Sequence, residues 1–290
     1  MADVMRTRRL VGLIGANIQR SLSPALHEDA FAAAGMIGHY HLMDMNVLGP
    51  RADLATLIAA VRVTGFAGVN VTHPCKEAVI PLLDEIAPDA QAVGAVNTVV
   101  IDAQGRTRGH NTDSIGWRRA FEETFGREAA EGRRAVVVGA GGAGRAVACA
   151  LLDLGVSALD IYDKDAARAK NLAAALAARV GPQRCRAADD LADAVAAADG
   201  VVNATPIGMY GYPGMAIPLE LLRPALWVAD VVYTPLETPL IAAARRLGCR
   251  VMTGGGMCVH QAAEAFHLFT GIRPDVARMH RLFATLCASS

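Results

Sequence analysis

The chain lacks an excess of charge of either sign. Its 290 residues include 28 Lys and Arg and 28 Asp and Glu, whereas proteins that bind nucleic acids or membrane surfaces by charge carry a basic excess. It also lacks an apolar run of transmembrane length. The apolar stretch near the N-terminus is interrupted by Gly12 and Gly15 and is too short for a secretory signal. We therefore expect a cytoplasmic protein without a nucleic-acid or membrane partner.

Paired cysteines are missing as well. The six cysteines are scattered among apolar residues without a C-x-x-C pair. This distribution favours buried free thiols in a reducing compartment, and we predict neither disulfides nor a metal site. Aromatic residues make up only 5% and charged residues 19%, but hydrophobic residues make up 53%. Such a chain should bury a large core, in one large domain or two ordinary ones.

What the sequence does contain is an alternation of short apolar runs with helical patterns. This alternation predicts βαβ units, a mainly parallel sheet and the α/β fold class. The predicted strands are residues 10–15, 39–47, 66–72, 95–101, 106–113, 135–138, 158–163, 200–205 and 226–233. The predicted helices include residues 24–34, 51–63, 114–125, 166–180 and 259–268. In the first of them Ser23 is the expected N-cap, Pro24 the first helical residue and Gly35 the stop.

A helix is also predicted to begin at Pro74, because a β-branched run ends there and proline is common at the first helical position. Lys76 would then lie in the first turn, where the helix dipole disfavours a cation by about 0.3–1 kcal/mol. Such a position favours the neutral amine, so Lys76 could take up or release a proton near neutral pH. A solvated surface lysine paired with Glu77 is the alternative.

A glycine-rich turn follows the predicted strand at residues 135–138. Gly139, Gly141 and Gly144 fit the pattern G-x-G-x-x-G and open a helix, which is the context of a dinucleotide-binding loop. The helix N-terminus would supply N–H groups to a pyrophosphate. No Lys-Ser/Thr follows, so a P-loop is excluded. A tight turn without a ligand is the alternative. The remaining residues of the loop are Ala140, Gly142 and Ala143.

Asp163 lies at the end of the next strand, about 20 residues past the loop, where a carboxylate would bind an adenosine ribose. A carboxylate there repels a 2′-phosphate, so NAD is favoured over NADP. Lys164 and Arg168 keep NADP open, since either could meet a phosphate. A strand-end or helix-cap aspartate is the alternative.

Several polar residues suggest a second ligand. Ser21 and Ser23 present two hydroxyls at a predicted helix N-terminus, a suitable place for a carboxylate. Asn97 lies inside an apolar strand and needs a partner. Asp113 is at a predicted helix start. The serines have a capping or turn role as the alternative, and Asp113 an ordinary N-cap role, but together with Asn97 and Lys76 they indicate hydride transfer to or from a polyhydroxylated acid.

Stretches along nearly the whole chain carry a family resemblance. They are SLSPALH, GVNVTHPCKEAVIPLLDE, GAVNTVV, GHNTDSIGW, VVVGAGGAGRAV, VVNATPIGM, VVYTPLETPL and GGGMCVHQAAEAF. With them the sequence resembles the shikimate dehydrogenase family, including its quinate/shikimate dehydrogenase branch.

The resemblance implies a substrate domain of residues 1–113, completed by C-terminal helices at 257–290, and a Rossmann-type NAD(P) domain of residues 114–256. It implies reversible reduction of 3-dehydroshikimate to shikimate, with oxidation of quinate to 3-dehydroquinate as a related activity. Lys76 would be the catalytic acid/base, paired with Asp113. The implied ligand contacts are Ser21 and Ser23 for the carboxylate, Thr72, Asn97, Tyr233 and Gln261 for the ring hydroxyls, Gly139 to Gly144 for the pyrophosphate, and Val231 and Gly254 for the nicotinamide.

The sequence departs from common members of the family in two places. Asp163-Lys164-Asp165 replaces the Asn-Arg-Thr of NADP-dependent members and resembles the NAD-preferring branch. Ser23 replaces the threonine of some quinate-preferring members, which favours shikimate. The alternatives are a strictly biosynthetic NADP enzyme, another two-domain dehydrogenase acting on a different small acid, and a non-catalytic dinucleotide-sensing module. A monomer or homodimer is expected, with small molecules as its partners.

Overall fold

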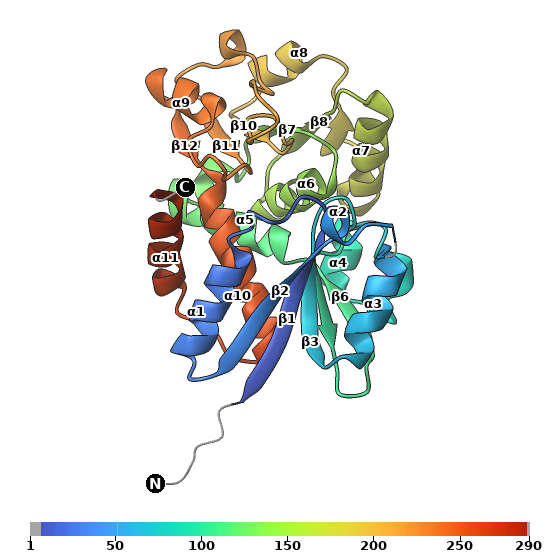
Figure 1. Ribbon diagram of the computed structural model, residues 1–290. Coiled ribbons are helices and arrows are strands. Elements are labelled where there is room, and N and C mark those ends of the chain that lie inside the picture. Colours follow the sequence, from blue (N-terminus) through green and yellow to red (C-terminus); the bar gives the residue numbers. More distant parts are fainter. Residues whose placement is uncertain (1–6, 51, 289–290) are drawn as a thin grey trace. The chain divides into compact units, whose positions relative to one another are not determined.

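The computed structural model describes residues 7–50 and 52–288 (Figure 1). The chain forms two compact units. Unit 1 contains the residues up to Thr112 and those from Gln261 onward, and unit 2 runs from Asp113 to His260. One boundary falls at the start of helix α5 (Thr112–Phe125) and the other inside helix α10 (Gly254–Thr270). Each unit has its own sheet and its own core.

The sheet of unit 1 combines parallel and antiparallel pairs. Its strand order is β2-β1-β3-β5-β6-β4. Strand β1 pairs in parallel with β2 and β3, whereas β5 pairs antiparallel with β3 and β6. The β5–β6 hairpin is the strand, turn and return strand predicted for residues 95–113. The strands are β1 (Arg8–Gly15), β2 (Ile37–Asp44), β3 (Phe66–Val71), β4 (Glu85–Ile86), β5 (Thr98–Ile101) and β6 (Thr107–His110).

Helices cover both faces of this sheet because its strands alternate their apolar side chains between the two faces. Val11 and Leu13 of β1 pack with Phe31 of α1 and Phe266 of α10, whereas Ile14 packs with α3 and α4 on the other face. The helices of unit 1 are α1 (Ser23–Ala33), α2 (Met45–Leu48), α3 (Leu54–Val63), α4 (Pro88–Val93), α10 from Gln261 onward, and α11 (Val276–Ala288).

The sheet of unit 2 is parallel throughout its described strands, with the order β12-β11-β10-β7-β8-β9. Helices α8 and α9 share a core with β7, β10 and β11, and α6 packs against β7 and β8. The strands are β7 (Arg134–Val138), β8 (Ala158–Tyr162), β9 (Cys185–Ala187), β10 (Gly200–Asn203), β11 (Trp227–Asp230) and β12 (Arg250–Met252). The helices, besides α5 and the start of α10, are α6 (Gly142–Leu154), α7 (Ala166–Val180), α8 (Leu191–Ala196) and α9 (Pro239–Arg246).

The predicted helix at Pro74 is wrong. Residues 72–79 form turns, and a 3₁₀ turn follows at Ile80–Leu82. The carbonyl of Lys76 accepts a hydrogen bond from the N–H of Val96 at 2.8 Å, whereas an α-helix would give that carbonyl to Ile80. Lys76 therefore does not lie in the first turn of a helix, and the helix-dipole argument for its chemistry falls.

Two smaller expectations are also corrected. Leu22 is at the N-cap position of α1 and Ser23 is its first helical residue, so Ser23 is not the N-cap. The strand predicted for residues 39–47 ends at Asp44, because the Asp44 carboxylate accepts the N–H of Asn46 and begins the short helix α2. Gly35 does follow the end of α1, with φ +71°.

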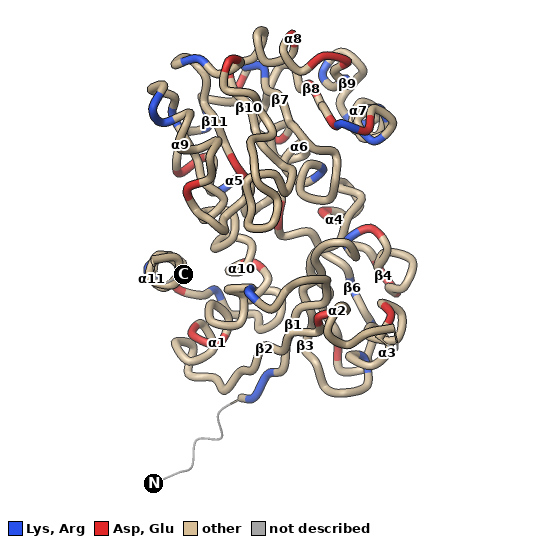
Figure 2. Tube along the Cα trace, turned by 45° about the horizontal axis from the view of Figure 1, so that its top comes forward, with Lys and Arg blue, Asp and Glu red and all other residues tan. Residues whose placement is uncertain are grey.

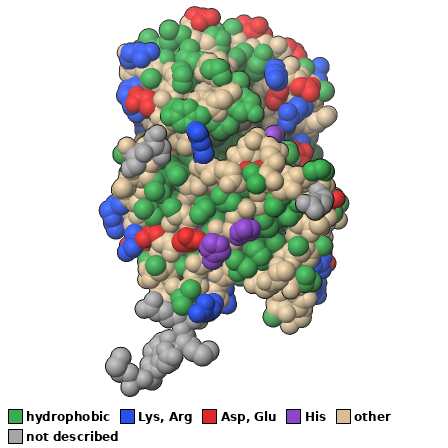
Figure 3. Space-filling view, in the orientation of Figure 1, with side chains coloured by type: hydrophobic (Ala, Val, Ile, Leu, Met, Phe, Trp, Pro, Cys, Tyr) green, Lys and Arg blue, Asp and Glu red, His purple; other side chains and the backbone are tan. Residues whose placement is uncertain are grey.

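Charge is dispersed over the described residues. Lys and Arg alternate with Asp and Glu along the trace of each unit (Figure 2). On the face in Figure 3 the charged side chains lie singly or in small groups between apolar ones. Among the described residues no helix has both the length and the apolar character needed to cross a membrane.

Candidate active site

One candidate site is an edge of the sheet in unit 1. Strand β1 has β2 on one side and β3 on the other, so the chain changes direction across the sheet at this point. Ligands of open α/β sheets bind at the carboxyl ends of the strands at such a switch point. Gly15, Asp44 and Val71 end these three strands, and β5 begins beside them with Thr98, which lies opposite Asn70.

The two predicted serines leave this edge on the loop between β1 and α1. The hydroxyl oxygen of Ser21 accepts the backbone N–H of Ser23 at 3.2 Å. The N–H of Ser21 donates to the carbonyl of Ile18 at 2.9 Å. Both side chains are partly exposed at the start of α1. The pair can therefore offer two hydroxyls to an anion.

Thr72 and Lys76 follow β3, and the chain at Thr72 and His73 lies beside the end of β1. The N–H of Ala16 donates to the carbonyl of His73 at 3.0 Å, so the chain after β1 is tied to the chain after β3. Gly15 is required here, since a Cβ atom on it would lie 2.4 Å from the Thr72 methyl carbon. The hydrogen bond from Val96 to the Lys76 carbonyl brings the residue before Asn97 to the Lys76 backbone.

Asn97 has the partner that its polar character in an apolar segment required. Its Nδ2 donates to the Thr112 hydroxyl at 2.9 Å, and its Oδ1 accepts the Thr112 N–H at 2.8 Å. The Thr98 hydroxyl and Asn70 extend this buried network to the Tyr40 hydroxyl, which donates to Asn70 Oδ1 at 2.9 Å. The sequence did not identify Thr98 and Thr112 as partners, because the contact depends on the β5–β6 pairing.

A second candidate site is the glycine loop of unit 2, between β7 and α6. Gly139 has φ +109°, and its N–H donates to the Tyr162 carbonyl at 2.7 Å. A Cβ atom on Gly144 would lie 1.8 Å from the Gly139 carbonyl oxygen, so only glycine lets α6 begin this close to the loop. Gly141 occupies the N-cap position without a capping side chain. The N–H groups of the first turn can therefore bind a phosphate.

Asp163 and Arg168 lie at this loop. Asp163 Oδ2 accepts the Ala140 N–H at 2.8 Å, and its Oδ1 accepts the Asp165 N–H at 2.9 Å. Arg168 Nη2 would be 3.4 Å from a Cβ atom on Gly141. Lys164 is exposed beside them. The Asp163 carboxylate thus caps the turn at Asp165 and is also hydrogen-bonded to the glycine loop. A capping role and a role in binding the cofactor are therefore compatible.

A buried network that the sequence analysis missed lies at the ends of β10 and β11. Asn203 Nδ2 donates to Asp230 Oδ1 at 2.9 Å, and the Thr238 hydroxyl donates to Asp230 Oδ2 at 2.7 Å. Val232 N–H also donates to Asp230. Burial raises the pKa of Asp230 to about 6, despite hydrogen bonds from Val232, Thr238 and Asn203 that act to lower it. A polar residue in the apolar run VVNAT was the available signal, as it was for Asn97.

This network positions two of the predicted nicotinamide residues. Val231 directly follows Asp230, and a Cβ atom on Gly254 would lie 2.4 Å from the Val231 carbonyl oxygen. The N–H of Gly254 donates to the Val232 carbonyl at 3.2 Å. Gly254 must therefore be glycine for α10 to begin against this segment. Tyr233 follows, partly exposed.

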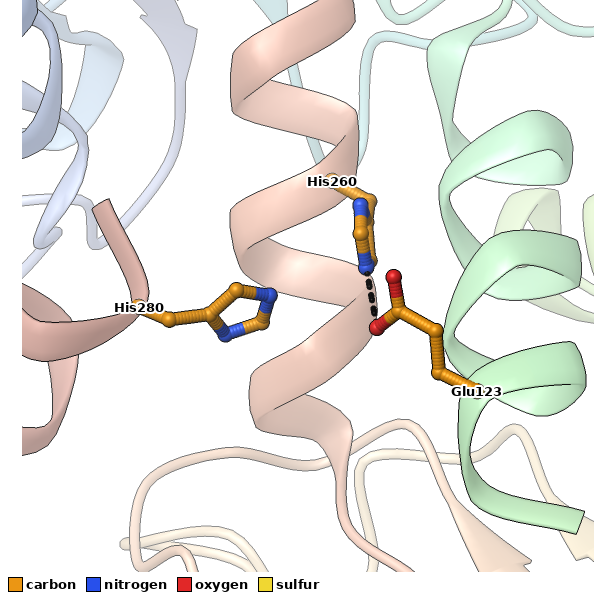
Figure 4. A group of neighbouring side chains, drawn as sticks. All are labelled: Glu123, His260 and His280. Carbon is orange, nitrogen blue, oxygen red and sulfur yellow. Dashed lines mark hydrogen bonds and ion pairs between the residues drawn. The ribbon is translucent and has the colours of Figure 1, made fainter. Parts of the chain in front are cut away.

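Unit 2 also anchors the start of α10. His260 Nε2 lies 2.8 Å from Glu123 Oε2 on α5 (Figure 4). Gln261, the next residue, begins the part of α10 that belongs to unit 1.

The predicted residues therefore fall into two sets. Asp113, buried in the first turn of α5, belongs to the second set although it directly follows Thr112. Unit 1 holds Ser21, Ser23, Thr72, Lys76, Asn97 and Gln261, and unit 2 holds Asp113, Gly139, Ala140, Gly141, Gly142, Ala143, Gly144, Asp163, Lys164, Arg168, Val231, Tyr233 and Gly254.

A parallel α/β unit with this glycine loop, together with a unit that carries hydroxyl, amide and amine groups at a sheet edge, defines an NAD(P)-dependent oxidoreductase of two-domain architecture. Family models agree with this class. Residues 13–99 match the shikimate dehydrogenase substrate binding domain, residues 121–208 match shikimate/quinate 5-dehydrogenase, and residues 254–282 match the shikimate 5′-dehydrogenase C-terminal domain. The chain belongs to the shikimate dehydrogenase family.

Similar proteins carry both cofactor names. Shikimate dehydrogenase (NADP(+)) of Streptomyces avermitilis is 50% identical over 97% of each chain. Quinate/shikimate dehydrogenase (NAD(+)) of Corynebacterium glutamicum strain R is 49% identical, over 96% of this chain and 98% of that one. Among solved structures, quinate dehydrogenase from Corynebacterium glutamicum in complex with NAD has a TM-score of 0.89 at 47% identity, covering 97% of this chain and all of the other.

Proposed function

We propose that this enzyme catalyses the reversible NAD(P)-linked oxidation of shikimate to 3-dehydroshikimate, prefers NAD, and also oxidises quinate to 3-dehydroquinate. Relatives of nearly equal identity carry NAD and NADP in their names, so overall similarity does not choose between the cofactors. The observation that carries the preference is the Asp163 carboxylate, hydrogen-bonded at 2.8 Å to the glycine loop. A negative charge at this place accepts ribose hydroxyls and repels a 2′-phosphate.

We assign the substrate to the sheet edge of unit 1. Ser21 and Ser23 bind the carboxylate, while Thr72, Asn97, Tyr233 and Gln261 bind the ring hydroxyls. The double hydrogen bond between Asn97 and Thr112 supports a fixed orientation for the Asn97 amide. Fixed polar groups discriminate well between hydroxylated substrates, because a missing partner leaves them unpaired.

We assign proton transfer to Lys76, with Asp113 beside the same hydroxyl. Bound NAD supplies the hydride acceptor at its nicotinamide. As the carbon loses its hydride, the hydroxyl must lose its proton, and Lys76 takes it as general base. In the reverse direction Lys76 returns that proton to the carbonyl oxygen. Asp113, as a carboxylate beside the same hydroxyl, stabilises the ammonium that Lys76 becomes when it takes the proton.

The cofactor assignment places the pyrophosphate on residues Gly139 to Gly144 and the nicotinamide against Val231 and Gly254. Arg168, near Gly141, adds positive charge at the phosphates. A cytoplasmic location and a monomeric or dimeric state stay predictions.

A four-way initial-rate assay tests the proposal: shikimate or quinate, each with NAD or NADP, at matched concentrations. We expect turnover of both acids with NAD, and kcat/KM at least tenfold lower with NADP. Turnover of shikimate with NADP only would contradict the NAD preference and would assign the discrimination to Lys164 or Arg168. If the enzyme binds NAD but turns over neither acid, the assignment of shikimate and quinate as substrates is wrong.

A further inference from the structure

The loop that carries Ser21 and leads to Ser23 at the start of α1 is held by one buried carboxylate. Asp44 ends β2 and is 2% exposed. Its Oδ1 accepts the N–H of Asn17 at 3.1 Å, and its Oδ2 accepts the N–H of Ile18 at 2.9 Å. Asn17 has φ +59°, a left-handed conformation that a non-glycine residue adopts when neighbouring contacts hold it there.

Two more donors complete the arrangement. Gln19 Nε2 donates to Oδ2 at 3.2 Å, and the Asn46 N–H donates to Oδ1 at 3.1 Å. The Asn46 amide also donates to Asn17 Oδ1 at 2.7 Å, so the turn is held from both sides. Each carboxylate oxygen of Asp44 thus receives two hydrogen bonds.

This arrangement requires a carboxylate rather than an amide. Both oxygens of Asp44 face donors, so an asparagine there would oppose donor to donor whichever way its amide turned. Burial acts to raise the pKa of Asp44, but the hydrogen bonds from Ile18, Gln19, Asn46 and Asn17 outweigh it and leave the pKa below its usual value.

Hydrogen bonds connect the loop that Asp44 holds to the two serines. Ile18 gives its N–H to Asp44 and its carbonyl to the N–H of Ser21. Ser21 in turn accepts the N–H of Ser23 with its hydroxyl oxygen. These hydrogen bonds therefore connect the Asp44 carboxylate, through the backbone of Ile18 and Ser21, to the Ser21 hydroxyl and the backbone N–H of Ser23.

We propose that Asp44 is a positioning residue for recognition of the substrate carboxylate. It holds the loop of residues 16–22 so that the Ser21 and Ser23 hydroxyls meet the two carboxylate oxygens together. The inference rests on the proposed function, because it takes the serine pair as the carboxylate site. It assigns no contact between Asp44 and the substrate.

The test compares Asp44→Asn with the unaltered enzyme on shikimate and on its methyl ester, with NAD. We expect kcat/KM for shikimate to fall 10- to 100-fold, mainly through KM, while the ester changes less than threefold. The preference for the free acid should therefore fall at least tenfold, and KM for NAD should stay within twofold. A residue that only stabilised the fold would change both substrates in parallel.

Asp53→Asn is the matched control. Asp53 also belongs to unit 1 and caps a helix by accepting the Thr56 N–H at 2.7 Å, but it is exposed and does not contact the serine loop. This variant should keep the preference for the acid over the ester. If Asp44→Asn fails to fold, Asn46→Ala, which keeps the carboxylate and removes the Asn17 contact, should reduce the same preference two- to fivefold.

The outcomes separate the two proposals. An unaltered enzyme that turns over neither shikimate nor quinate overturns the proposed function and this inference with it. An active enzyme whose preference for acid over ester is the same in the Asp44 or Asn46 variant overturns the inference alone.

Discussion

The two sheet edges each contain a buried aspartate, and the pKa values of these two aspartates are shifted in opposite directions. In unit 1 the switch point lies beside β1, and Asp44 ends the neighbouring strand β2. In unit 2 it lies between β7 and β10, and Asp230 ends β11, the strand next to β10. Each carboxylate holds the chain that leaves a strand, yet the pKa of Asp44 is lowered and that of Asp230 is raised.

The difference comes from the number of donors and from burial. Asp44 receives four hydrogen bonds, three of them from backbone N–H groups. Asp230 receives three, one of them from the backbone, and is completely buried. A buried carboxylate keeps a low pKa when enough hydrogen-bond donors replace the water that it loses. Its pKa rises when fewer donors replace that water.

The largest expected effect is a loss of turnover when the proposed acid/base of unit 1 is removed, while cofactor binding by unit 2 is retained. Lys76→Ala should lower kcat by about 100- to 10,000-fold, since it removes the general acid/base. NAD affinity, measured by fluorescence titration, should stay nearly unchanged. Lys170→Ala, which removes an exposed lysine of α7, is the control and should keep full activity. Turnover of Lys76→Ala at the normal rate would refute the assigned role.

The second prediction concerns the pH dependence of the two carboxylates. The folded pKa of Asp230 lies above its unfolded value, so its stabilising contribution is present below about pH 4 and is lost as pH rises through about 6. The stability of the unaltered protein relative to Asp230→Asn should therefore fall by about 2 to 3 kcal/mol between pH 4 and pH 7.

Asp44 should show the opposite sign. Its folded pKa is lowered, so its contribution is present above its unfolded pKa and is lost as pH falls through the folded value. The stability of the unaltered protein relative to Asp44→Asn should rise with pH across the acid range. Urea unfolding at several pH values measures both differences. Slopes of the same sign would contradict the comparison.

The third prediction concerns His27, a buried residue of α1 in unit 1. Its ring stacks on Tyr40 at 4.7 Å, and neither ring nitrogen has a hydrogen-bond partner among the described residues. Burial lowers the pKa of His27 to about 3. The unfolded chain therefore takes up the proton first, and stability is lost as pH falls below about 6.5.

His27→Leu removes this effect without breaking a hydrogen bond to a described residue. The variant should gain about 2 kcal/mol over the unaltered protein on going from pH 8 to pH 5. Thermal or urea unfolding at the two pH values measures the change. A difference in stability that does not depend on pH would contradict this account, because it would mean that the pKa of His27 is the same in the folded and unfolded protein.

The smallest predicted effect concerns the choice between NAD and NADP in unit 2. Asp163→Ala should raise KM for NAD about tenfold, equivalent to about 1.4 kcal/mol. Because loss of the Ala140 contact affects both cofactors, the readout is the ratio of kcat/KM for NAD to that for NADP. Asp165→Ala, which removes the N-cap of α7 two residues away, should leave this ratio nearly constant. An unchanged ratio in Asp163→Ala would remove the cofactor argument.

Local patterns were enough to predict most strands and the glycine loop. The runs at 66–72, 135–138 and 158–163 are rich in apolar residues, and each forms a strand within one or two residues of the prediction. The helix at Pro74 failed because the Lys76 carbonyl is bonded to Val96, a contact between segments about 20 residues apart. Local propensity does not contain such a contact.

The positioning residues were missed for a similar reason. Asp44 stands in an alternating run that predicts a strand, and its role depends on donors from a loop 26 residues earlier in the chain. Asn203 gave the same signal as Asn97, a polar residue in an apolar run, but its partner Asp230 belongs to another strand. The site roles that follow from family resemblance stay predictions until they are measured.

The most direct measurement is a pair of steady-state experiments on Asp44→Asn and Asp230→Asn, each giving KM for shikimate and KM for NAD. If each buried carboxylate organises the candidate site of its own unit, Asp44→Asn raises KM for shikimate at least tenfold and Asp230→Asn raises KM for NAD severalfold. The other constant should stay within twofold in each case. Equal rises of both constants in both variants would contradict this division between the two sheet edges.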